Sequence, residues 1–535
     1  MRPFAVPAKF GQAGYMYPMN ETGDRPLDLF VVGGGINGAG IACDAAGRAL
    51  KVGLCEMNDF ASATSSKATK LIHGGLRYLE QYEFRLVREA LQEREVLLAK
   101  APHLSWPLRF VLPHEPHLRP RWMLRLGLFL YDHLDWHMTL PKSIAVDLPT
   151  SKFGVGLKPS FQKGFVYSDA WVDDARLVIC NLKSAREMGA RIFARHRCVS
   201  ARRSADGKLW NITLEGPGGV PVHLQARGLV NAAGPWVKHF LDEQTEVKTN
   251  KRVRLIKGSH IIVPRLHEGD HAFILQNSDN RIVFVIPYER SFSLIGTTDI
   301  AVDSGEAPVC SPEEIAYLCD IAGHYMQKPV RPEEVVWTYS GVRPLFDDGD
   351  DNPSAVTRDY HLEVDGRLEA GGAVGAAPLL SVFGGKITTY RRLAEHALKD
   401  LHPYFPRMGG PWTDSRAIYD GEMADAPTFE KAFEQFVDGA AATYPGLPKD
   451  LVHVLARRHG SGLDDLLEGV KSVADLGRHF GGHLYEVEVR HLVRDEWAVE
   501  AEDVLWRRTK EGLHMTEAQR TEFARWMDEQ RPNFT

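Results

Sequence analysis

Hydrophobic residues near the start of the chain are spaced as in an α/β fold. Residues 27–32 form a short apolar run that ends at three glycines, Gly33, Gly34 and Gly35. We interpret this run as a buried strand that enters a tight turn. Small residues from Gly38 to about residue 50 predict a helix, and residues 52–56 predict a second strand. The ordered chain therefore begins with a βαβ-like unit.

The middle of the chain is typical of an antiparallel sheet. Short strand-like runs at 191–194, 260–263, 281–286 and 292–295 are separated by turn residues. We expect this sheet to be inserted into the α/β framework. A helix is predicted to start at Ser311, because Pro312 occupies its first position and Glu314 can reach back to the cap amide.

The two ends of the chain differ in character. Residues 1–26 are polar and broken by glycine and proline, so we expect a mobile tail and infer no function for it. Beyond residue 411, charged helical segments at 428–439, 448–459 and 484–497, and one from Thr516, predict a separate helical domain.

Composition and charge exclude several classes of protein. The sequence has 64 Lys and Arg against 70 Asp and Glu, a net charge of −6, and we expect no nucleic-acid partner because such binders usually carry a basic excess. The six cysteines are scattered without the spacing of a zinc site, so we expect reduced thiols, no metal and a cytoplasmic protein. We find neither a secretory signal nor an apolar run of about 18 residues that could span a bilayer.

A glycine motif after the first strand carries the first chemical signal. In Gly33-x-Gly35-x-x-Gly38, the first glycine permits the turn, the second lets amides approach a pyrophosphate, and the third lets helix and strand pack closely. Glu56 ends the second strand, where a carboxylate accepts hydrogen bonds from a ribose and repels a 2′-phosphate. The motif favours FAD or NAD over NADP, with a turn that binds nothing as the alternative.

Two later glycine turns favour FAD over NAD. Residues 228–236 and 382–390 each place small residues after a predicted strand, and the second puts Gly384 and Gly385 before a helix that runs to about residue 400. Amides and the helix dipole there could hold the polar edge of a flavin. Each turn alone could be purely structural, but three in this order are typical of two-domain flavoproteins.

These patterns predict an α/β protein with a Rossmann-like FAD-binding domain, an inserted antiparallel-sheet substrate domain and a C-terminal all-helical domain. The FAD-binding domain would be discontinuous, over residues 27–100, 160–250 and 355–405. The substrate domain would comprise residues 101–159 and 251–354, and the helical domain residues 411–535.

Several blocks of the sequence resemble FAD-dependent glycerol-3-phosphate dehydrogenase, the respiratory, quinone-linked enzyme. The resemblance covers about residues 27–515, and its blocks are Phe60 with 64–66, 70–79, 257–260, 296–299, 339–345, 357–360, 383–386 and 503–510. Thr69 stands where the family pattern leads us to expect serine, a change that keeps the hydroxyl. The resemblance implies that sn-glycerol 3-phosphate is oxidised at C2 to dihydroxyacetone phosphate, with FAD as the hydride acceptor and a protein base for the O2 proton.

The resemblance also implies roles for individual residues. Because arginine matches phosphate oxygens well, the implied substrate ligands are Arg77, Tyr78, Arg343, Arg358 and Lys386. His260 is the candidate base, since imidazole titrates near neutral pH, and Arg343 is the second catalytic candidate. A satisfied structural histidine and solvated arginines are the alternatives. The residues expected at the cofactor are Gly33, Gly35, Asn37, Gly38, Glu56, Thr64, Ser65, Ser66, Lys70, His73, Gly74, Ala233, Gly234, Gly385, Lys386 and Thr388.

A basic and aromatic segment at residues 117–138 is a candidate membrane contact. After Pro120 it could form a short amphipathic helix in a bilayer interface, or a buried helix with a charged edge. The resemblance implies the first, because that family is peripheral to the membrane and passes electrons to quinone. By the same resemblance we expect a homodimer on the inner face of the cell membrane.

Three other functions are compatible with these motifs. A glycerol-3-phosphate oxidase would use dioxygen and release peroxide. An amine or amino-acid oxidase on the same flavin fold would bind a carboxylate and should lack this set of arginines and the C-terminal domain. A flavin-bound scaffold would not turn over at all.

Overall fold

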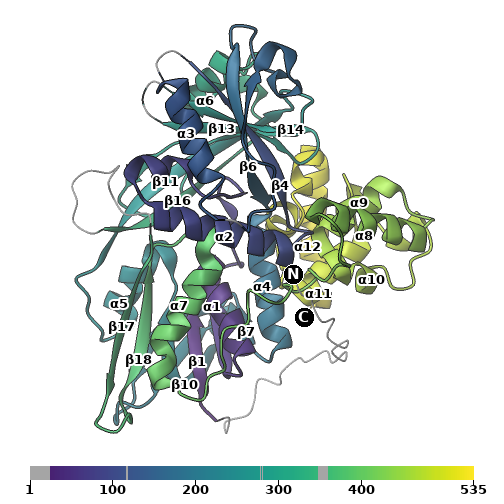
Figure 1. Ribbon diagram of the computed structural model, residues 1–535. Coiled ribbons are helices and arrows are strands. Elements are labelled where there is room, and N and C mark those ends of the chain that lie inside the picture. The colour runs from purple at the N-terminus through teal and green to yellow at the C-terminus, as the bar shows by residue number, and fades with distance from the viewer. Residues whose placement is uncertain are drawn as a thin grey trace.

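The computed structural model describes residues 25–115, 118–135, 137–277, 279, 281–347 and 359–534. Figure 1 shows three parts: a sheet with helices at the bottom, a second sheet at the top, and a group of helices at the right formed by the C-terminal part of the chain. The predicted tail, residues 1–26, lies outside the described residues except for Arg25 and Pro26.

The first sheet has a core of parallel strands, and this core includes both strands of the predicted βαβ unit. Its strand order is β17-β18-β10-β1-β2-β7, with β8 and β9 forming a hairpin on β10. The parallel strands are β1 (Leu27–Val32), β2 (Val52–Glu56), β7 (Arg191–Ala194), β10 (Pro221–Asn231) and β18 (Val374–Phe383). The antiparallel additions are β8 (Arg197–Arg203), β9 (Trp210–Glu215) and β17 (His361–Leu368).

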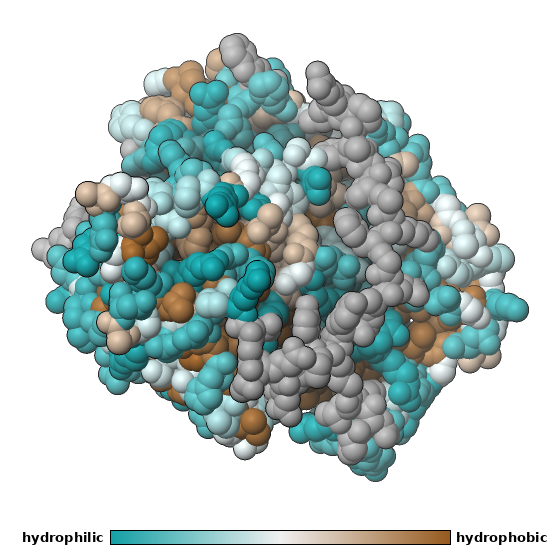
Figure 2. Space-filling model, turned by 90° about the horizontal axis from the view of Figure 1, so that it is seen from below, coloured by the Kyte–Doolittle hydropathy of each residue, from teal (hydrophilic) through white to brown (hydrophobic). Residues whose placement is uncertain are grey.

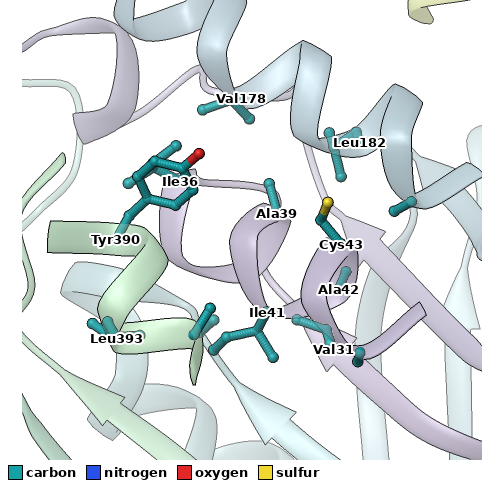
Figure 3. Packing of buried hydrophobic residues seen from close by; sticks show 14 of the residues in the cluster. Val31, Ile36, Ala39, Ile41, Ala42, Cys43, Val178, Leu182, Tyr390 and Leu393 are labelled. Carbon is teal, nitrogen blue, oxygen red and sulfur yellow. The ribbon is translucent and has the colours of Figure 1, made fainter. Parts of the chain in front are cut away.

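Helices cover one face of this sheet. Helix α1 (Ile36–Gly47) packs between α4 (Asp174–Glu187) and α7 (Tyr390–Leu401), with Ile36, Leu182 and Leu393 in one apolar core (Figure 3). The hairpin β8–β9 and helix α5 (Val237–Gln244) contribute to the core on the opposite face. Both faces are therefore buried, which explains why β1 reads as a continuous apolar run: Val31 faces one core and Phe30 the other.

The second sheet has ten strands in a largely antiparallel arrangement. Its order is β15-β11-β14-β13-β12-β4-β6-β3, with β16 paired to β11 and β5 paired to β6; the pair β4–β12 is parallel. The strands are β3 (Leu71–Ile72), β4 (Ser105–Pro113), β5 (Ile144–Asp147), β6 (Lys163–Val172), β11 (Arg252–Pro264), β12 (Ala272–Gln276), β13 (Ile282–Tyr288), β14 (Phe292–Gly296), β15 (Ile300–Val302) and β16 (Trp337–Asp347).

Helices α2 (Phe84–Lys100), α3 (Arg121–Tyr131) and α6 (Pro312–Tyr325) complete this part of the chain. Helix α6 has the predicted start: Ser311 accepts a hydrogen bond from the Glu314 amide, and the Glu314 side chain bonds back to the cap amide.

Two strands belong to a different sheet from the one we expected. The run at 191–194 is β7, which pairs in parallel with β2 in the first sheet rather than in the inserted sheet. Residues 163–172 form β6, which pairs with β3, β4 and β5 in the second sheet, although the predicted boundary at 160 placed them with the FAD-binding segments. A short apolar run carries no information about its partner, because pairing is decided by strands far away in sequence.

The C-terminal part is helical but contains one small sheet. Its helices are α8 (Phe429–Thr443), α9 (Lys449–His459), α10 (Leu463–Leu466), α11 (Glu486–Glu496) and α12 (Glu517–Phe534), with a π-helical turn at Asp503–Arg508. Strands β19 (His479–Gly481) and β20 (Leu484–Tyr485) form a two-stranded sheet, so the expectation of an all-helical domain was wrong in this detail.

Buried ion pairs attach this helical part to the part built on the first sheet. Asp59 accepts two hydrogen bonds from Arg508, each 2.7 Å long, and also pairs with Arg507. Arg176 of α4 pairs with Glu496 of α11. All five side chains are buried, so each charge depends on its partner. The molecular face seen in Figure 2 is, by contrast, mostly hydrophilic, with small separated hydrophobic areas.

Candidate active site

The glycine turn after β1 has the geometry that a dinucleotide needs. Gly33 has a positive φ of 111°, and a Cβ built on it would lie 2.5 Å from the Ala232 carbonyl oxygen. A Cβ on Gly38 would lie 1.9 Å from the Gly33 carbonyl oxygen, so only glycine lets α1 pack this closely on the turn. Helix α1 begins directly after Gly35, and its first amides can bind a phosphate.

The predicted acid and hydroxyl residues surround this turn. Glu56 accepts hydrogen bonds from the amides of Gly34 and Asn58, both at 2.8 Å. The Ser65 hydroxyl accepts one from the Ile36 amide at 2.9 Å. Two buried oxygens, Asn37 Oδ1 at the start of α1 and Ser66 Oγ next to Ser65, have no hydrogen-bond partner among the described residues. Unsatisfied buried polar atoms beside a glycine cradle fit a cofactor rich in hydroxyl and phosphate groups, as FAD is.

The three glycine clusters of the sequence meet at this turn. Ala232 and Ala233, which follow β10, contact Gly33, and the Asn37 amide group donates to the Gly384 carbonyl at 3.1 Å. Gly384 and Gly385 both have positive φ angles, 83° and 104°. Segments about 350 residues apart therefore form one continuous cradle.

The Gly384–Gly385 turn leads to a second group of predicted residues. Thr388 lies in the short 3₁₀ turn Ile387–Thr389, and its hydroxyl accepts a hydrogen bond of 3.4 Å from the His73 amide. The Lys386 ammonium lies 4.2 Å from the centre of the Tyr78 ring. Gly74 donates through its amide to Tyr131 and Asp169.

The substrate-facing candidates lie on two paired strands, β11 and β16. Their register pairs Ile256 with Arg343, Gly258 with Gly341, and His260 with Tyr339. The middle pair has no side chains, so side chains from other segments lie close to the backbone between Arg343 and His260. A Cβ on Gly258 would lie 2.5 Å from the Thr297 hydroxyl, and one on Gly341 would lie 2.5 Å from the Lys67 Cβ. The Arg343 guanidinium reaches back over this surface, since its Nη2 lies 3.2 Å from where a Cβ on Gly258 would be.

His260 is held in one orientation by its neighbours. Its ring stacks on Tyr339, with ring centres 4.7 Å apart and planes 20° apart. Its Nε2 lies 2.9 Å from the Thr69 hydroxyl, and its Nδ1 is buried without a partner among the described residues. Gly296 closes on the ring, because a Cβ there would lie 2.1 Å from a ring carbon.

The electrostatic setting of His260 differs from the one that sequence reasoning used. Burial lowers the pKa of His260 well below its ordinary value, and the positive charges of Lys70 and Arg343 lower it further. The imidazole is therefore neutral at physiological pH, in the form that can accept a proton. Only 2% of its surface is exposed, a property that the sequence does not reveal.

Two predicted cations already have acidic partners. The buried Lys70 ammonium pairs with Asp174 at 2.7 Å, and Arg343 pairs with Asp299 at 2.7 Å while remaining partly exposed. Arg358 and the Arg77 side chain lie outside the described residues, so their proposed phosphate contacts stay predictions.

Several side chains that shape this site were not assigned a role from the sequence. Three of them belong to or adjoin the blocks that resemble the family: Thr69, Tyr339 and Asp299. Their position in or beside these blocks was the signal that could have identified them. No motif pointed to Asp174.

Comparisons with known proteins agree with this geometry. Residues 28–391 match the family described as FAD dependent oxidoreductase, and residues 412–529 match the C-terminal domain of alpha-glycerophosphate oxidase. The structure is similar to that of a glycerol-3-phosphate dehydrogenase from Bacillus halodurans complexed with FAD, with a TM-score of 0.73 and 27% identity over 97% of this chain and 93% of the other.

Three curated relatives are similar over nearly their whole length. D-erythritol 1-phosphate dehydrogenase of Brucella abortus is 52% identical, covering 94% of this chain and 97% of the relative. Glycerol-3-phosphate dehydrogenase of Pseudomonas aeruginosa is also 52% identical, covering 95% and 96%. The aerobic glycerol-3-phosphate dehydrogenase of Escherichia coli is 49% identical, covering 94% and 97%.

The close approach at Gly38 predicts the effect of adding a single methyl group. Gly38→Ala is expected to lower the flavin content of the purified protein at least ~10-fold, because the methyl group would overlap the Gly33 carbonyl and distort the turn. The matched control is Gly323→Ala in helix α6, where no atom lies within 4 Å of the new Cβ. That variant should keep its flavin and gain about 0.5 to 1 kcal/mol of stability. Equal flavin content in the two variants, measured by absorbance, would contradict this role of Gly38.

Proposed function

The chain belongs to the FAD-dependent oxidoreductase family, and we propose that it oxidises the secondary alcohol of sn-glycerol 3-phosphate to the ketone of dihydroxyacetone phosphate. The observation that carries the proposal is the surface shared by Arg343 and His260, a cation and a neutral imidazole on either side of a glycine pair. An anionic polyol can place its charged groups toward the cation and a hydroxyl toward the imidazole. Two relatives of this chain are named as dehydrogenases of phosphorylated polyols, D-erythritol 1-phosphate and glycerol 3-phosphate, and they support this substrate class.

The cofactor is FAD, held by the glycine cradle, and when bound it supplies the two-electron acceptor of the oxidation. In our proposal the Glu56 carboxylate binds the adenosine ribose, and Asn37, Ser65 and Ser66 bind the phosphate and ribityl part. Lys386 and Thr388 would lie at the polar edge of the flavin.

The protein residues have separate tasks in this proposal. His260 accepts the proton of the O2 hydroxyl, while Arg343 binds the developing negative charge on that oxygen. Arg77, Tyr78, Arg358 and Lys386 bind the phosphate, where several cations are needed for a dianionic group. Burial of His260 excludes water from the base and keeps the imidazole unprotonated.

The first test is reduction of the bound flavin without oxygen. Glycerol 3-phosphate is expected to bleach the yellow wild-type protein, and His260→Gln is expected to slow this step by ~100-fold, the usual contribution of a general base. Because the pKa of His260 is lowered, the wild-type rate should stay constant through neutral pH and fall only in more acidic solution.

The matched control for this test is His267→Gln, which changes another buried histidine that packs near Phe273 and His271. This variant should be reduced at the wild-type rate. If the wild-type protein is not bleached, the proposed substrate is wrong; if His260→Gln is bleached at the wild-type rate at every pH, the substrate stands and His260 is not the base.

A second candidate substrate is a four-carbon polyol phosphate. The relative from Brucella abortus, at 52% identity, is a D-erythritol 1-phosphate dehydrogenase, and this identity equals that of the Pseudomonas glycerol-3-phosphate dehydrogenase. Both substrates combine a phosphate ester with a secondary alcohol, so the same cation and base serve either one.

The match of residues 412–529 to a domain of alpha-glycerophosphate oxidase also keeps dioxygen as an alternative electron acceptor.

We propose further that the protein binds the inner face of the cell membrane and passes electrons to quinone. Helix α3, which starts after Pro120 as predicted, exposes Trp122 by 67%, Leu126 by 50% and Phe129 by 49%. None of the helices among the described residues is long and apolar enough to cross a bilayer. An exposed apolar face next to arginines is suited to lie in the lipid interface. A homodimer remains part of this proposal by resemblance alone.

Charge reversal at this helix tests the membrane proposal. Replacing the exposed residues Arg119, Arg121 and Arg125 with Glu is expected to release the protein from sedimenting anionic vesicles, because three attractive charges become repulsive. The control replaces three exposed cations elsewhere, Lys208, Lys248 and Arg252, with the same change in net charge. Retained binding of the first variant, or equal loss of binding in both, would show that α3 is not the contact.

A further inference from the structure

Three buried ligand-type side chains meet in the C-terminal part, outside the proposed active site. His459 ends helix α9, and His491 and Glu496 lie on α11. A potential ligand atom of each lies within 4.8 Å of the other two. His459 and Glu496 are fully buried and the His491 side chain is 8% exposed. The two rings meet edge to face, with centres 5.1 Å apart.

Each of the three has one buried atom without a hydrogen-bond partner among the described residues. These atoms are His459 Nδ1, His491 Nε2 and Glu496 Oε1. The Lys183 ammonium lies 3.6 Å from Glu496 Oε1, a distance too long for a hydrogen bond. Unpaired buried polar atoms are costly, so three in one cluster require a physical explanation.

The partner on the other side of the His459 ring decides which of its nitrogens carries the proton. His459 Nε2 lies 2.9 Å from Glu488 Oε1. A carboxylate can only accept, so this nitrogen carries its hydrogen and His459 Nδ1 presents a lone pair. His491 Nδ1 has two neighbours, the Asp495 carboxylate at 3.2 Å and the Arg494 guanidinium at 3.5 Å. The cluster therefore holds at least two acceptors, His459 Nδ1 and Glu496 Oε1, which cannot satisfy one another.

This arrangement has the chemistry of a metal site. A histidine that binds a metal usually donates its other N–H to a carboxylate, and His459 does so toward Glu488. Two imidazoles and one carboxylate, with water as a fourth ligand, are a common set for zinc.

Two positive charges near Glu496 weaken the binding of a metal cation at such a site. Arg176 pairs with Glu496 Oε2, and Lys183, which also bonds to Asp420, lies near Oε1. Both cations oppose a further positive charge. The two imidazoles, with Glu488 behind His459, must therefore supply most of the affinity.

We propose that His459, His491 and Glu496 bind a divalent zinc ion that joins helices α9 and α11 next to helix α4. The ion has a structural role and takes no part in the proposed oxidation. It would hold the helical part in the position where Glu496 meets Arg176 of the FAD-binding part.

The test is the metal content of the intact flavoprotein, purified without a histidine tag and equilibrated with equimolar zinc chloride. Mass spectrometry is expected to find about one zinc per chain after removal of free metal. X-ray data collected on both sides of the zinc absorption edge should place an anomalous peak between the three residues. His491→Gln should retain less than about a tenth of the metal, whereas the control His267→Gln should retain all of it.

Zinc absent from the wild-type protein, with a water molecule between the three residues, would overturn the proposal. So would a His491→Gln protein that keeps its zinc, because the metal would then be bound elsewhere. The anomalous measurement needs no variant, so the result stands even if His491→Gln fails to fold. Neither result bears on flavin reduction by glycerol 3-phosphate, which tests the active site separately.

Discussion

The segment from Thr64 to Lys70 joins the two sheets, and the geometry of the candidate active site depends on it. The Thr64 hydroxyl donates to the Val342 carbonyl at 2.6 Å, and the Tyr339 hydroxyl donates to the Ala68 carbonyl at 2.8 Å. Thr69 contacts His260 at 2.9 Å. These three bonds hold strands β11 and β16 to the segment that also bonds to the glycine turn through Ser65 and Ile36. The segment thereby connects the glycine cradle to the strands that carry Arg343 and His260.

Helix α4 extends this connection to the C-terminal helices. Asp174, at its start, pairs with Lys70 of the joining segment, and the preceding Asp173 pairs with Lys510. Further along the helix, Arg176 pairs with Glu496. Ion pairs therefore tie the start of this helix both to the joining segment and to the C-terminal part. Asp174 and Arg176 are buried, so loss of one of their partners would leave an uncompensated buried charge.

Local signals in the sequence predicted local structure well. The strand, turn and helix from Leu27 to Gly47 follow from an apolar run, small residues and the glycine spacing, all of which act over a few residues. The capping box at Ser311 was predicted for the same reason. The family resemblance supplied His260 and Arg343, and the structure places both on one surface of paired strands.

Properties that depend on distant partners could not be predicted. The sheet to which β6 and β7 belong is decided by β4 and β2, which lie far away in sequence. The lowered pKa of His260 depends on burial by β16 and the charge of Lys70. The contact of Asp174 with Lys70 spans 104 residues and follows from no motif. His459, His491 and Glu496 come together only through the packing of α9 against α11, so no spacing in the sequence pointed to this cluster.

The central claim is that this surface binds a phosphorylated polyol whose secondary alcohol reduces FAD, with glycerol 3-phosphate as the proposed substrate. The most direct measurement compares rates of anaerobic flavin bleaching by glycerol 3-phosphate and by glycerol, which lacks the phosphate, over a range of concentrations. Our account predicts a rate constant divided by dissociation constant at least ~10-fold higher for glycerol 3-phosphate, equivalent to about 1.4 kcal/mol, because only the phosphate ester can bind the cations. No bleaching by glycerol 3-phosphate, or an equal value for glycerol, would contradict it.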